Sequence, residues 1–68
     1  MNKALLRSFM VLHGDTNKDL AKYLGITEQS VINKINENGT EFKLCEIRRI
    51  RMRYNLSSND VDLIFFNH

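Results

Sequence analysis

Apolar side chains recur three and four positions apart along the chain, and no segment alternates long enough to predict a β-strand. The first run predicts a helix through Leu5–His13 that ends near Gly14, a residue suited to the position after a helix. Thr16 then stands as an N-cap with Asp19 three residues later, which completes a capping box for a second helix. Gly25 ends that helix, so the N-terminal part of the chain predicts two helices joined by a short loop.

The remaining helices carry similar end signals. Thr27 is the expected N-cap of a third helix, and the turn residues 36–39 follow it. Helical spacing predicts a fourth helix over about residues 44–54. Ser57 and Asp60 form another capping box, which starts a fifth helix. Five short helices joined by loops predict an all-α orthogonal bundle.

Length and composition favour one globular domain. A chain of 68 residues is expected to form a single domain over residues 1–68, because domains rarely divide below about 100 residues. Its 43% hydrophobic and 26% charged residues argue against disorder. No apolar run reaches about 18 residues and the N-terminal segment is charged, so we expect neither a membrane span nor a signal peptide. The lone Cys45 cannot form an internal disulfide, which fits a reducing cytoplasm.

The net charge of +2 is modest, but it is unevenly distributed. Basic and acidic residues balance over residues 1–42, so the whole excess lies in residues 43–68. Four arginines within residues 48–53 suggest a nucleic-acid stripe, but helical spacing scatters them around the fourth helix. This cluster alone therefore does not predict a DNA-binding face.

The individual arginines are expected to have structural or solvated roles. Arg49 and Arg53 share one face of the predicted helix, opposite its apolar residues, and we expect both to be solvated. Arg51 lies on the apolar side. We expect its stem to lie on the core and its guanidinium to pair with an acid such as Asp62.

The most informative motif covers about residues 17–36. Ala21 supplies a small side chain where two helices would touch, and Gly25, four residues later, accepts positive φ in a tight turn. Ile26 and Val31 are expected to fill the wedge between the helices, with Leu20 and Leu24 in register. This combination is the helix-turn-helix pattern.

On these residues the chain resembles the Cro/repressor (XRE-type) family of lambda-repressor-like DNA-binding domains. The segments LAKYLGIT and EQSVINKI resemble the two motif helices, and the likeness extends over nearly the whole chain. The resemblance implies a five-helix lambda-repressor-like bundle and a small phage or mobile-element regulator. Its expected partner is a double-stranded DNA operator, and no cofactor or small-molecule ligand is expected.

The resemblance also implies which residues read DNA. In this family the third helix enters the major groove, and the corresponding positions here are Thr27, Glu28, Gln29, Ser30 and Asn33, with Lys34 beside them. Glutamine and asparagine pair with adenine N6 and N7, and glutamate accepts from cytosine N4, so the side-chain chemistry suits base reading. We expect Gln29 and Asn33 to be the main readers. The alternative is that these side chains form a plain solvated face.

Phosphate contacts are expected from the start of the second helix and from the loop before the fourth. The candidates are Asn17, Lys18, Lys22, Thr40 and Lys43. The N-termini of these helices would add backbone N–H donors and the positive end of a dipole. Alternatively, each lysine is a solubilising surface charge.

Two features depart from the family pattern. Many members pair an arginine in the first helix with a glutamate near the end of the third, whereas those places here hold Met10 and Ile35. An apolar contact can replace a buried ion pair without loss of stability. The loop after the third helix is also longer, which bears on whether Lys43 reaches DNA.

The fifth helix offers more apolar side chains than one face can bury. Val61, Ile64 and Phe65 can face the core together, which leaves Leu63 and Phe66 for a partner surface. We expect a homodimer there, at least on DNA, and therefore a palindromic site. The alternative is that Phe66 folds back on its own core.

Catalysis finds little support in the sequence. His13 and His68 are the only histidines, and Cys45 is expected to be a small packing residue near the start of the fourth helix. No metal-ligand spacing or phosphate-binding glycine loop is present. We predict a non-enzymatic, cytoplasmic, nucleoid-associated DNA-binding regulator. The alternative is a protein-interaction module or antitoxin-like adaptor with the same fold.

Overall fold

The structure is a computed structural model that describes residues 1–66, all of them in helices or connecting loops. The five α-helices of this range are α1 (Lys3–Leu12), α2 (Asn17–Leu24), α3 (Glu28–Ile35), α4 (Leu44–Tyr54) and α5 (Ser58–Val61). The last continues directly into a π-helical segment, η1 (Asp62–Phe66). The expected all-α bundle is thereby confirmed. His68, one of the two histidines of the sequence, lies outside the described residues.

The predicted capping signals form as expected. The Thr16 hydroxyl accepts from the Asp19 N–H at 3.2 Å while the Asp19 carboxylate accepts from the Thr16 N–H at 2.9 Å. Ser57 and Asp60 make the same reciprocal pair at the start of α5. Gly25 ends α2 in the left-handed region, with φ of +74°. Local side chains therefore set where these helices begin and end.

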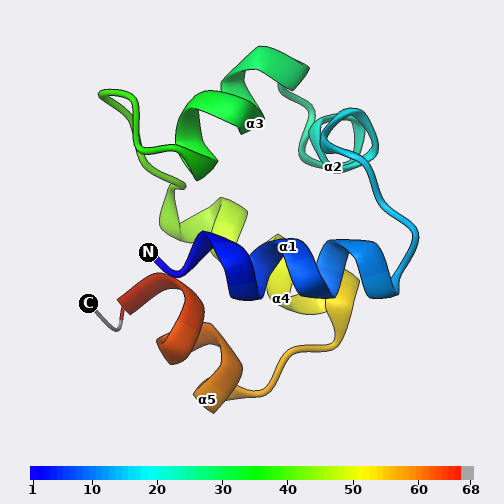
Figure 1. The fold of residues 1–68 in the computed structure, drawn as a ribbon, viewed down its shortest axis with the longest axis vertical. Helices are drawn as coiled ribbons and strands as arrows, with labels where there is room; N and C mark the ends of the chain where they lie inside the picture. Colours follow the sequence, from blue (N-terminus) through cyan, green and yellow to red (C-terminus); the bar gives the residue numbers. More distant parts are fainter. Residues whose placement is uncertain (67–68) are drawn as a thin grey trace.

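The helices pack around α1, which crosses the middle of the bundle in front of α4 (Figure 1). The pair α2 and α3 lies on one side of α1, and α5 with η1 lies on the other (Figure 1). The two ends of the described chain lie together, because the Asn2 N–H donates to the Ile64 carbonyl at 2.7 Å. No helix of residues 1–66 is long and apolar enough to cross a membrane.

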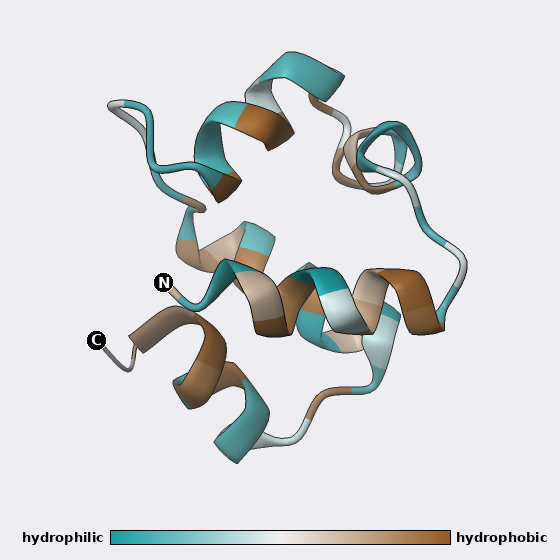
Figure 2. Cartoon of the chain, viewed as in Figure 1, coloured by the Kyte–Doolittle hydropathy of each residue, from teal (hydrophilic) through white to brown (hydrophobic). Residues whose placement is uncertain are grey.

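Every long helix contributes apolar side chains to one core. The fully buried residues are Leu6, Leu20, Val31, Ile35, Ile50 and Ile64. Met10 is 3% exposed, so the two positions that hold an ion pair in the family pattern are both apolar and buried here. Figure 2 shows that hydropathy changes along the last helical stretch, from a hydrophilic α5 to a hydrophobic η1. Val61, Ile64 and Phe65 are buried there, as predicted.

Two of the arginines of α4 are not simply solvated, contrary to expectation. Arg53 binds the Asp15 carboxylate with two hydrogen bonds of 2.6 and 2.8 Å. Arg49 donates to the backbone carbonyls of Tyr23 and Leu24, the last residues of α2. Both guanidinium groups also lie over the Tyr23 ring, 4.7 and 4.9 Å from its centre. The two arginines make these contacts because helix packing brings a carboxylate, backbone carbonyls and an aromatic ring close to them.

Arg51 and Cys45 also differ from their expected roles. Arg51 donates to the Leu56 carbonyl and the Ser58 hydroxyl, both at 3.2 Å, and so spans the loop between α4 and α5. No ion pair joins it to Asp62 in the described part of the chain. Cys45 is exposed instead of packed, because it lies on the outer face of α4.

The Asp15 carboxylate is the centre of a three-residue cluster. It accepts from Arg53 and, at 2.7 Å, from the Tyr54 hydroxyl. The hydrogen bonds from Arg53 lower the pKa of Asp15 below its ordinary value of 3.8, and the Tyr54 hydroxyl adds to that shift against the opposing effect of burial. Burial and the bond to Asp15 raise the pKa of Tyr54. The cluster ties the loop after α1 to the end of α4.

We predict that Asp15→Asn lowers the free energy of unfolding by about 2 kcal/mol at neutral pH, because two charge-assisted hydrogen bonds weaken. The lowered pKa means that the carboxylate stabilises the fold fully above pH 3.8 and loses this effect as the pH falls further. Urea denaturation at neutral pH and near about pH 2.5 should therefore show the difference from wild type shrinking in acid. Tyr54→Phe is the control, since it removes one hydroxyl but keeps the pair with Arg53. An undiminished difference in acid would contradict the role assigned to the carboxylate.

Candidate nucleic-acid interface

The helices α2 and α3 form a helix-turn-helix. Each has eight residues, and only the segment from Gly25 to Thr27 separates them. The Ile26 N–H donates to the Ala21 carbonyl at 3.0 Å, which closes the turn over the end of α2. Ala21 and Val31 are buried between the helices and Ile26 is half-buried, as the motif predicted. A small side chain and a left-handed glycine thus permit the close crossing.

The face of α3 that points away from the bundle is polar. Thr27, Glu28 and Gln29 are exposed, and Ser30 and Asn33 are half-buried. The Thr27 hydroxyl accepts from the Ser30 N–H at 3.1 Å, so the N-cap of α3 is satisfied. Figure 1 shows α3 at the edge of the molecule, with no helix covering its outer side.

Two amide side chains on this face are joined. The Gln29 Nε2 donates to the Asn33 Oδ1 at 3.1 Å, across one turn of α3. This bond does not use the Gln29 carbonyl oxygen, an acceptor, or the Asn33 amide nitrogen, a donor. The sequence predicted both residues as base readers but did not predict the hydrogen bond between them.

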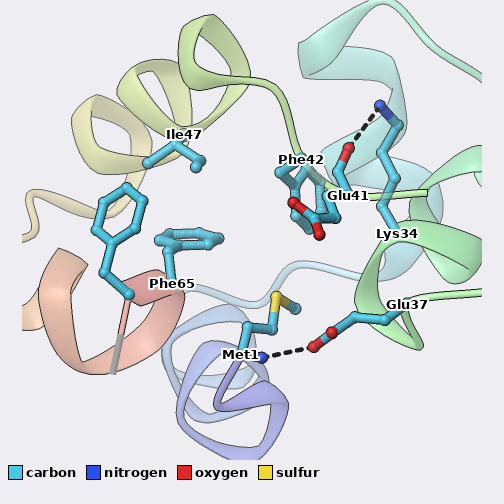
Figure 3. A pocket seen from close by; sticks show the side chains of 8 residues that line it. Met1, Lys34, Glu37, Glu41, Phe42, Ile47 and Phe65 are labelled. Carbon is cyan, nitrogen blue, oxygen red and sulfur yellow. Dashed lines mark hydrogen bonds and ion pairs between the residues drawn. The ribbon is translucent and has the colours of Figure 1, made fainter. Parts of the chain in front are cut away.

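Lys34 does not belong to this face, and its expected role in base reading is wrong. Its side chain is 10% exposed and its ammonium lies 2.9 Å from the Glu46 carboxylate of α4. It also donates to the Glu41 carbonyl at 3.4 Å (Figure 3). Lys34 follows the buried Val31 by three positions, so helical geometry turns it inward.

Glu46 completes this buried pair. Its carboxylate accepts from the Lys43 N–H at 2.7 Å, which caps α4, and from Lys34. Burial raises the pKa of Glu46, but the Lys43 N–H and the Lys34 ammonium outweigh it, so the net shift is downward. The side chain thus serves as both a helix cap and an ion-pair partner.

The proposed phosphate-contacting residues divide between two places. Lys18 and Lys22 are exposed on α2, and Asn17 is half-buried in its first turn. Thr40 is half-buried and Lys43 exposed near the start of α4. Helix α3 and the first part of the loop after it lie between these two groups in the sequence.

The exposed apolar residues are spread over the bundle. Leu63 is 37% exposed and Phe66 53% exposed, which confirms the exposure predicted for both. Val11, Leu12 and Met52 are about three-quarters exposed at the ends of α1 and α4, and the sequence analysis did not single them out. No group of three or more possible metal ligands occurs within residues 1–66.

Comparisons with protein-family models, with curated proteins and with solved structures return no match to this chain. The likeness to the Cro/repressor family therefore remains a prediction from the motif residues.

We predict that Lys34→Met lowers the free energy of unfolding by about 3 kcal/mol, because it leaves the Glu46 carboxylate buried without its cation. The measurement is urea denaturation at neutral pH. Lys22→Met is the matched control on an exposed helix position, where a change within about 0.5 kcal/mol is expected. If both variants were equally stable, the ion pair would carry no stability and Lys34 would return as a candidate for DNA contact.

Proposed function

We propose that this protein is a sequence-specific, double-stranded DNA-binding transcriptional regulator of the Cro/repressor type. The observation that carries the proposal is the exposed polar face of α3 on a helix-turn-helix, with Gln29 and Asn33 at its centre. A helix with such a face fits the major groove, where base edges offer hydrogen-bond donors and acceptors.

The joined amides suit the recognition of adenine. Adenine presents N7 as an acceptor and N6 as a donor in the major groove. The free Asn33 amide nitrogen and the Gln29 carbonyl oxygen match these two groups. Glu28, one position before, is exposed and can accept from cytosine N4. Thr27 and Ser30 already bond to each other, so they are expected to contribute less to base reading.

Backbone contacts would position α3 in the groove. Lys18 and Lys22 extend from α2, and the N-terminus of that helix adds free N–H groups and a positive dipole end. Asn17, Thr40 and Lys43 are the further candidates. Phosphate contacts of this kind carry no sequence information but set affinity and its salt dependence.

A homodimer through the last helical stretch would place two copies of α3 on one operator. The exposed Leu63 and Phe66 are apolar side chains that a second copy would cover. Two-fold symmetry would then require a palindromic site with half-sites about one DNA turn, ~34 Å, apart. A regulator of this kind acts in the cytoplasm at the nucleoid.

The first test is selection from a randomised duplex library with the purified chain, repeated at low and high salt. We expect enrichment of a motif that persists at high salt, because base contacts are retained when phosphate contacts weaken. Gln29→Ala and Asn33→Ala should each cost about 1–3 kcal/mol and relax the preference at an adenine. The double variant should lose less than the sum, because the two amides act as one unit.

The control for this selection is Lys22→Ala, which should weaken binding to all duplexes alike and lower the salt dependence. Enrichment of nothing at either salt concentration would contradict the proposal.

We further predict that Phe66→Ser weakens self-association, because it removes a half-exposed aromatic ring from the proposed interface. Sedimentation equilibrium, with and without the selected duplex, measures the change. Val11→Ser is the control, since it removes an exposed apolar side chain at the C-terminal end of α1, whereas η1 lies beside the N-terminal end of that helix. Identical association of wild type and the Phe66 variant would exclude this interface.

A second candidate function is a protein-interaction module. Val11 and Leu12, 76% and 77% exposed at the end of α1, favour it because a buried protein interface would cover such side chains. The library selection separates the two functions, since an interaction module would enrich no DNA motif.

A further inference from the structure

A cavity of about 230 Å³ lies beside the last turn of α3. Its walls come from that turn, the loop before α4, the first turn of α4, η1 and Met1 (Figure 3). An apolar cavity of about 150 Å³ already holds a benzene ring, so this volume admits a molecule of one ring or a short branched chain. Apart from Lys34, which is turned inward to Glu46, none of the residues first assigned to DNA reading or phosphate contact lines it.

Three phenylalanines contribute to the wall, and two of them, Phe42 and Phe65, are core residues that are 8% and 9% exposed. Phe42 and Phe65 stand nearly perpendicular, with 83° between their rings and 6.0 Å between the ring centres. Phe66 and Ile47 add further apolar surface. When two perpendicular rings line the same cavity, the negative face of one ring can attract a cation through a cation–π interaction.

The charges at the rim favour a cation over an anion. The Lys34 ammonium points out of the cavity toward the Glu41 carbonyl and pairs with Glu46, so its charge is neutralised (Figure 3). The Glu41 carboxylate lies beside the Phe42 ring in Figure 3 and makes no ion pair with any residue from 1 to 66. The N-terminal ammonium is bound to Glu37. The cavity therefore presents aromatic rings and an unneutralised carboxylate.

We propose that this cavity binds a small alkylammonium cation, with the methylated nitrogen against the Phe42 and Phe65 rings and its charge facing Glu41. Rings and a carboxylate attract such a cation together, whereas a neutral apolar molecule gains only the burial of its surface. A carboxylate or phosphate ligand would meet Glu41 with like charge. The proposal is independent of DNA binding, because it uses other residues.

The test compares choline with 3,3-dimethyl-1-butanol, which has the same shape without the charge. Binding is followed by the amide NMR shifts of the full chain, with signals from the loop before α4 and from η1 expected to move. Choline should bind at least about fivefold more tightly than the alcohol, the advantage expected of one cation–π contact. Saturable shifts with that preference support the site, while equal affinity or no saturable shift overturns it.

Glu41→Gln separates the carboxylate from the rest of the cavity. Because Glu41 is exposed, this variant should keep the wild-type fold, and its affinity for choline should fall about fivefold while that for the alcohol stays the same. Asp62→Asn is the matched control, an exposed acid that does not line the cavity, and should leave both affinities unchanged. Equal losses in the two acid variants would show only surface attraction of cations and would overturn the site.

Discussion

The Asp15 carboxylate joins the loop that enters the helix-turn-helix to the end of α4, and this contact constrains how the motif lies against the rest of the bundle. Arg53 and Tyr54 both donate to it, and Arg53 in turn covers the Tyr23 ring of α2. Arg49 reaches the same ring and binds the last carbonyls of α2. One helix, α4, thus fixes α2 through its own C-terminal turns. This matters in a small chain, because a core of modest size leaves less apolar burial to hold helices at a set angle.

The other end of α4 fixes α3. Glu46 caps α4 and holds Lys34, the penultimate residue of α3, in a buried ion pair. Breaking such a pair costs more than its formation gains, so it acts chiefly to specify one arrangement. Both helices of the motif are therefore attached to one rigid element. The outer face of α3, with the joined Gln29 and Asn33, is presented in a single orientation, which is what recognition of a regular DNA groove requires.

Three other regions of the molecule differ in their chemistry. The outer face of α3 is polar, the exposed part of η1 is apolar, and the cavity between the end of α3 and η1 is aromatic with an acidic rim. These regions share the elements that build them but few residues. The proposed DNA binding can therefore be separated from self-association and cation binding by single substitutions, because Gln29 and Asn33 lie outside the other two regions, whereas Phe66 belongs to both of those.

The sequence by itself determined the helices and their ends, because capping boxes and left-handed glycines act between residues three or four positions apart. It also located the helix-turn-helix and the exposed Leu63 and Phe66, since local spacing decides which side of a helix is apolar. The partners of the charged residues were decided only by the tertiary structure. Lys34 has the charge expected of a DNA-contacting residue, yet in the fold it pairs with Glu46, which is twelve positions away in the sequence. Asp15 and Arg53, 38 positions apart, meet only because the loop after α1 lies against the end of α4, and no local pattern encodes such a distance.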